Sequence, residues 1–125
     1  MSRCIENRII AEIERLIESG KQDAEKLTVR DTVYTDLGGV NYKLWNTDIF
    51  TYDRQNKAFM FRPSSNGAHK YIISQTTKSR LTALLWNFCN IGFYQRKNRL
   101  YTTSYATELE TDKWYVVEEN GLRKL

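Results

Sequence analysis

Apolar residues recur at helical spacing over the first twenty positions of the chain: Ile5, Ile9, Ile10, Ile13, Leu16 and Ile17. Their period of three and four predicts an amphipathic helix over residues 3–19. Ser2 is suited to cap its start, and Gly20 stands where a left-handed terminal residue is favoured. The opposite face is expected to carry the charges, Glu6, Glu12, Glu14, Arg15 and Glu18. The apolar stripe fits packing on the protein's own sheet and also a subunit interface. We expect the segment 1–20 to be the oligomerisation element of a homo-oligomer.

The pattern changes after a polar connection over residues 21–26. Aromatic and β-branched residues then alternate with polar ones, which is typical of half-buried strands. We expect strands over 29–34, over 40–51 as one piece or two broken near Asn46, and over 58–62. The turns fall at 37–39 and 53–57, and a loop over 63–67 precedes a further strand at 71–74.

A second helix is predicted by an apolar stripe in the later half of the chain: Leu81, Leu84, Leu85 and Phe88. This helix should run to about Asn90, with Gly92 as its stop signal. Two short strands, 93–95 and 100–103, then flank a basic hairpin tip, and 114–117 forms a last strand. The order predicts a single α+β domain over 1–125. Its parts are an N-terminal helix, an antiparallel sheet of about four to six strands, one central helix packed on that sheet, and a C-terminal hairpin and strand.

Composition supports one folded domain with a mild preference for anionic partners. The 125 residues include eight Tyr, five Phe and three Trp, whose large rings contribute much buried area. The net charge of +4 favours phosphates or nucleic acid as partners, but 19 basic residues against 15 acidic ones is a small excess. There is no apolar stretch of the roughly 20 residues that a membrane span needs, and no secretory signal pattern. We therefore expect a cytoplasmic protein that does not contact a membrane.

Residues that could support catalysis are few. His69 is the only histidine, and no Cys-x-x-Cys, His-x-x-x-His or glycine-rich phosphate loop occurs. Cys4 and Cys89 lie far apart, which suits free thiols in a reducing cytosol, although a disulfide between them stays open. Asp48 is an isolated carboxylate, and a catalytic group that includes His69 could assemble only in space. We expect a non-enzymatic protein without metal or cofactor.

The segment Gln75-Thr-Thr-Lys-Ser-Arg80 opens the second helix with an unusual charge distribution. Thr76 or Thr77 is expected to be the N-cap. Lys78 and Arg80 then place positive charge at the helix end where the macrodipole favours anions. Either a carboxylate from elsewhere in the chain compensates them, or an external phosphate or carboxylate binds there.

A second basic cluster lies at the hairpin tip, where Arg96, Lys97 and Arg99 are flanked by Tyr94 and other rings. Cations beside aromatic faces suit a nucleotide or a single strand, because guanidinium groups meet phosphates while rings stack on bases. The same charges also fit a solvated tip that discourages sheet-edge association. Trp86 lies off the leucine stripe of the second helix, so it is either an exposed stacking face or part of the core margin.

Two short segments, Leu44-Trp-Asn-Thr-Asp-Ile-Phe-Thr-Tyr52 and Thr76-Thr-Lys-Ser-Arg-Leu81, resemble a group of small phage and prophage proteins. Their shared pattern is a "TDI" strand, a hairpin and a "TTKxR" helix start, and it spans residues 40–102 here. The chain departs from that pattern at Tyr71-Ile72-Ile73 and at Thr82. The layout is also similar to that of phage anti-Thoeris sponges, which sequester nucleotide-derived immune signals.

The resemblance implies a phage-type counter-defence protein in the host cell cytoplasm that binds a phosphorylated, nucleotide-like small molecule. The ligand would be held by residues of both basic clusters: Thr76, Thr77, Lys78, Arg80, Arg96 and Arg99. Tyr94 or Trp86 would offer the stacking face. Two alternatives are an inhibitor that binds a host defence protein or nucleoprotein complex, and a single-stranded nucleic-acid-binding protein.

Overall fold

The computed structural model describes residues 4–65, 73–103 and 108–125. Helix α1 spans Cys4–Ser19, and Gly20 follows it with a φ of 67°, as the sequence predicts for its end. Helix α2 spans Gln75–Cys89. Its left-handed terminal residue is Asn90, with a φ of 56°, so the stop signal comes two residues before Gly92.

The predicted α+β class is confirmed. A seven-stranded antiparallel sheet has the order β1-β2-β3-β4-β5-β9-β10. Its strands are β1 (Ala24–Lys26), β2 (Asp31–Thr35), β3 (Gly39–Leu44), β4 (Thr47–Asp53), β5 (Ala58–Phe61), β9 (Tyr115–Glu118) and β10 (Gly121–Lys124). The sheet is larger than expected because β1 and β10 extend its two edges.

A second, three-stranded antiparallel sheet has the order β6-β7-β8. Its strands are β6 (Phe93–Arg96), β7 (Arg99–Thr102) and β8 (Glu108–Leu109). The hairpin of β6 and β7 confirms the predicted strand pair around the basic tip. The strand predicted over 71–74 does not form at Ile73 or Ser74, while residues 71 and 72 lie outside the described ranges, as do Ser2 and His69.

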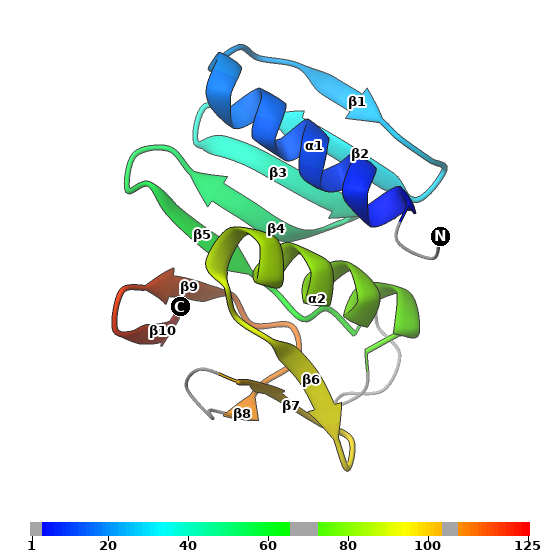
Figure 1. Cartoon of the computed structure of the whole chain (residues 1–125), viewed down its shortest axis with the longest axis vertical. Helices are drawn as coiled ribbons and strands as arrows, with labels where there is room; N and C mark the ends of the chain where they lie inside the picture. The colour runs from blue at the N-terminus through cyan, green and yellow to red at the C-terminus, as the bar shows by residue number, and fades with distance from the viewer. Residues whose placement is uncertain (1–3, 66–72, 104–107) are drawn as a thin grey trace.

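Both helices cover the same face of the large sheet, and the small sheet lies below α2 in the view of Figure 1. The apolar stripe of α1 packs inside the protomer, where Ile9, Ile13 and Leu16 are fully buried in the core. On α2 the stripe of Leu81, Leu84 and Leu85 is buried as predicted. Packing on the protein's own sheet therefore accounts for the isoleucines, and the homo-oligomer stays a prediction.

Candidate functional site

The start of α2 differs from the sequence prediction. Ser74 is the N-cap, with φ −69° and ψ 158°, and its Oγ accepts a hydrogen bond from the Thr77 amide at 3.1 Å. The predicted cap at Thr76 or Thr77 is therefore wrong. Thr77 is fully buried, and its hydroxyl lies 3.0 Å from the Ser74 hydroxyl. The Lys78 amide makes the first main-chain hydrogen bond of the helix, to the Ser74 carbonyl at 3.0 Å, and the cap occupies one amide of the first turn, that of Thr77.

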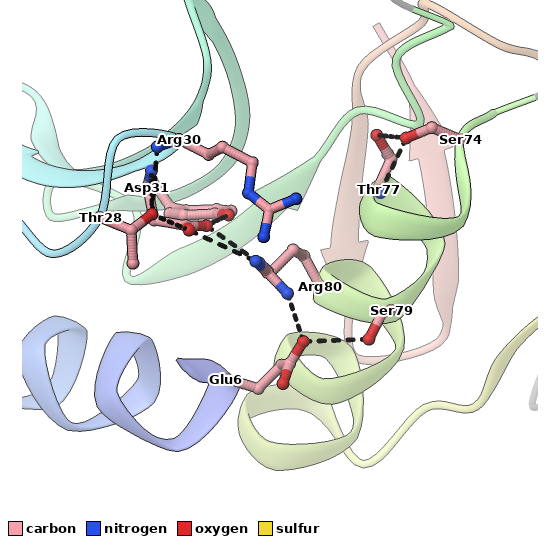
Figure 2. A network of polar contacts seen from close by, with 9 residues as sticks. Glu6, Thr28, Arg30, Asp31, Ser74, Thr77, Ser79 and Arg80 are labelled. Carbon is pink, nitrogen blue, oxygen red and sulfur yellow. Dashed lines mark hydrogen bonds and ion pairs between the residues drawn. The ribbon is translucent and has the colours of Figure 1, made fainter. Parts of the chain in front are cut away.

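Arg80 points into the protein and not toward solvent (Figure 2). Its side chain is almost fully buried between two carboxylates. Nε donates to Asp31 Oδ1 at 2.9 Å, and Nη1 donates to Glu6 Oε2 of α1. A carboxylate from elsewhere thus compensates this cation, which was one of the two options. In this conformation Arg80 and Thr77 are closed to solvent, so neither belongs to a ligand site as predicted.

The two carboxylates are held by further hydrogen bonds. Tyr42 and Thr28 donate their hydroxyls to Asp31. Burial alone would raise the pKa of Asp31, but the hydrogen bonds from Arg80, Thr28 and Tyr42 outweigh it and hold that pKa below its ordinary value. The pKa of Tyr42 is raised by burial and by its bond to Asp31. This cluster is a structural ion-pair network that joins α1, β2 and α2.

The two acidic partners of Arg80 were not predicted from the sequence, although a signal for them exists. Glu6 was placed on the polar face of α1, but it continues the buried positions Ile9, Ile13 and Leu16 at steps of three and four, and it is 2% exposed. Asp31 lies two residues before the buried Val33, on the same face of β2. A charge at an apolar position of the local period indicates a buried ion pair.

The side chains of the β6–β7 hairpin lie on two faces. Phe93 and Leu100 are buried on the inner face. Two cross-strand pairs, Tyr94 with Tyr101 and Arg96 with Arg99, occupy the other face because side chains alternate along a strand. The tyrosine rings are stacked, with centroids 5.5 Å apart and planes 23° apart.

Lys97 and Asn98 close the hairpin with positive φ angles of 53° and 62°, which a two-residue type I′ turn requires. This turn keeps Arg96 and Arg99 directly opposite each other. Arg99 forms an exposed ion pair with Glu108 of β8, at 3.1 Å, whereas no hydrogen bond or ion pair of the Arg96 side chain occurs in the described part of the chain. The predicted basic cluster is therefore solvent-facing, and its charge is only partly matched.

Three open hollows run along α2 and the hairpin. One of about 670 Å³ is lined by Tyr94, Arg96, Lys97, Arg99 and Tyr101. The next, about 260 Å³, is lined by Thr82, Trp86, Gly92, Phe93, Tyr94 and Thr103. The third, about 250 Å³, is lined by Glu6, Gln75, Lys78, Ser79, Thr82 and Ala83. Because Tyr94 lines the first two and Thr82 the last two, the hollows are neighbours. We call the surface formed by these three groups of lining residues the α2–hairpin track.

The track brings together five of the eight predicted site residues, Lys78, Trp86, Tyr94, Arg96 and Arg99. Trp86 is 59% exposed, so its side chain is a surface ring and not part of the core margin. Thr76 is half-buried on the first turn of α2 and lines none of these hollows.

Another hollow, of about 810 Å³, lies over β5, β9 and β10 and was not anticipated. Its lining mixes acids and bases, Asp53, Glu118 and Glu119 with Lys57 and Arg123. These charges nearly cancel, so the hollow offers no preference for an anion.

The other candidate groups are structural where the structure describes them. Asp48 accepts hydrogen bonds from the Tyr34 hydroxyl, at 2.8 and 2.9 Å to its two oxygens. Cys89 is a free thiol, and burial raises its pKa to about 12. Within residues 4–65, 73–103 and 108–125 there is no group of three or more His, Cys, Asp or Glu side chains placed to hold a metal ion, and neither helix is long and apolar enough to cross a membrane.

Comparison of the chain with protein families, with curated proteins and with solved structures found no match. The resemblance to phage and prophage proteins therefore stays a prediction.

Proposed function

We propose that this protein binds single-stranded nucleic acid along the α2–hairpin track. The observation that carries the proposal is the exposed face of the hairpin, where the stacked Tyr94–Tyr101 pair adjoins three cations and the exposed Trp86. Rings offer stacking faces to bases of any sequence, worth roughly 1–3 kcal/mol per base, while cations follow the phosphates.

An extended ligand fits this surface better than a small sequestered one. A site that sequesters a small molecule normally encloses most of its surface. Here the neighbouring hollows are open, and two members of the anion site expected at the start of α2, Thr77 and Arg80, are buried in internal contacts. The hairpin cations, Arg96, Lys97 and Arg99, are exposed, and successive phosphates of a strand can reach them.

The counter-defence role and a nucleotide-like small ligand remain predictions from the resemblance, and so does a host protein as target. They give different results in the same binding experiment. A sponge binds mononucleotides, cyclic nucleotides or ADP-ribose with a defined stoichiometry. A strand-binding protein prefers oligonucleotides and loses affinity as salt rises.

The test is fluorescence anisotropy of a labelled 12-nucleotide DNA strand with the full chain, over a range of salt concentrations. Lys78 and the three hairpin cations predict a slope of log K against log salt of roughly −2 to −3, at about 0.7 per phosphate. Arg96→Ala should reduce the slope by about 0.7. Arg123→Ala is the matched control, because Arg123 is an exposed arginine on β10, outside the track. Absent or salt-independent binding would refute the proposal.

A second pair of variants tests the stacking. Trp86→Ala should weaken binding by about fivefold or more, as expected for the loss of one base–ring contact. Trp45 is also exposed, at 54% against 59% for Trp86, and it lies in the turn between β3 and β4. Equal losses for Trp45→Ala and Trp86→Ala would show that the track is not the binding surface.

A further inference from the structure

The hollow of about 810 Å³ over β5, β9 and β10 lies on the face of the large sheet that the helices leave open. Phe61 and Tyr115 form a cross-strand pair whose stacked rings are buried in the core, on the side of the helices. The next pair, Met60 with Val116, points to the opposite face because side chains alternate along a strand. Both helices lie on the core side (Figure 1), so no described helix covers this face. The lining of the hollow includes the half-buried Met60 and Leu125, which is 60% exposed, so its floor is partly apolar.

Two charges of opposite sign on the rim of this hollow have no partner. Lys57 lies in the turn between β4 and β5, and Glu119 lies in the turn between β9 and β10. Both side chains are exposed, and neither makes a hydrogen bond or an ion pair in the described part of the chain. The other charges of the lining are used within the chain. Asp53 accepts hydrogen bonds within its own turn, and Arg123 donates to Glu118 at 2.9 Å. Among the described lining residues, the rim thus keeps one free cation and one free carboxylate.

The two free charges indicate which kind of partner fits this face. A partner with charge of one sign would be attracted by one of them and repelled by the other. A second copy of the chain offers both signs. A two-fold axis places the same patch of both copies together, so that the lysine of each copy can meet the glutamate of the other. An apolar centre with a polar rim is also the usual composition of a protein–protein interface, and methionine is enriched there.

We propose that two copies of this chain associate about a two-fold axis through the open face over β5, β9 and β10, with Lys57 of each copy facing Glu119 of the other. Met60 and Leu125 lie at the apolar centre of this interface. The surface differs from the apolar stripe of α1, which is buried within the protomer. It also lies across the sheet from α2, so the inference does not rest on the proposed function, and the dimer leaves α2 of both copies accessible.

The experiment measures the mass of the full chain in solution by size-exclusion chromatography with light scattering, over a range of protein concentrations. We expect the wild-type chain to have the mass of two copies. Lys57→Glu and Glu119→Lys should each weaken the dimer by about tenfold or more, because each change occurs twice in a symmetric dimer and brings like charges together. Glu14→Lys is the matched control and should dimerise like the wild type, because Glu14 is an exposed glutamate of α1. A wild-type chain that is monomeric at every concentration would overturn the inference.

A mixture of the two charge-reversal variants tests the pairing itself. Each variant alone opposes like charges at both contacts, whereas a dimer of one Lys57→Glu chain and one Glu119→Lys chain opposes unlike charges at both. The equimolar mixture should therefore recover the mass of two copies, and so should a chain that carries both changes. Since both positions are exposed, neither change should alter the circular dichroism spectrum. Single variants that dimerise as strongly as the wild type, or a mixture that stays monomeric, would refute the assignment.

Discussion

Arg80→Ala tests whether the cation in the first turn of α2 is structural. The change removes the only cation that contacts both Glu6 and Asp31 in the described part of the chain, and these carboxylates are 2% and 0% exposed. Removing one partner of a buried ion pair costs about 3–5 kcal/mol, because the remaining charge is left without compensation. A domain of this kind is stable by about 5–15 kcal/mol in total. The melting temperature should fall by roughly 10–20 °C.

Lys78→Ala is the matched control, since Lys78 lies two residues earlier on the same helix and is only half-buried. Its loss should change stability by less than about 0.5 kcal/mol. Both variants are measured by urea unfolding, followed by circular dichroism, with the slopes compared to confirm two-state behaviour. Adding Glu6→Gln to Arg80→Ala should recover part of the loss, because one uncompensated charge disappears. A loss below about 1 kcal/mol for Arg80→Ala would refute the structural role and return this residue to the candidate ligand site.

Three further predictions follow from the interior. The pKa of Asp31 is lower in the folded chain than in the unfolded chain, where it is roughly 3.9. The Asp31 carboxylate therefore contributes its full stabilisation at pH values above the unfolded pKa, and this stabilisation is lost as the pH falls through the folded pKa. Urea midpoints should therefore stay level from pH 7 to about 5 and drop in stronger acid, and a rise there would contradict the assignment. Gly39→Ala should lower the free energy of unfolding in urea by about 3 kcal/mol or more, because a Cβ at this position would lie 1.8 Å from the Tyr52 carbonyl oxygen. Gly38→Ala is the control and should be nearly neutral, since the atom nearest to its Cβ would be 3.5 Å away. Alkylation of Cys89 at pH 8 should be slow in the native chain and fast in urea, as measured for each cysteine by mass spectrometry. Rapid labelling of Cys89 in the native chain would show that its thiol is accessible.

The elements that the sequence predicted are those with a local pattern. The stripes of α1 and α2 repeat within a few residues, and the basic hairpin tip separates two short apolar strands. The missed edge strands have no such pattern. All three residues of β1 are exposed, and this strand forms through backbone pairing with β2, which side-chain periodicity does not report. β10 pairs with β9 in the same way.

The candidate site was predicted in part for the same reason. The outer face of the hairpin follows from alternation along two strands, so Tyr94, Arg96 and Arg99 were identified from neighbours in sequence. The direction of Arg80 depends on carboxylates that are 74 and 49 residues away. A spacing rule within one helix cannot show which of two cations in the first turn will find such partners. Helix-dipole reasoning identified the mismatch correctly but could not choose between an internal and an external anion.

Strand binding along the α2–hairpin track should also stabilise the native chain, because the track exists only in the folded state. At a strand concentration 100 times Kd, binding to the native state alone adds about 2.7 kcal/mol to the free energy of unfolding. A 12-nucleotide strand should therefore raise the melting temperature of the wild-type chain and of Arg123→Ala by similar amounts. The rise should be smaller for Trp86→Ala, which lacks the exposed ring of the track. Equal rises for Arg123→Ala and Trp86→Ala would place the bound strand elsewhere on the molecule.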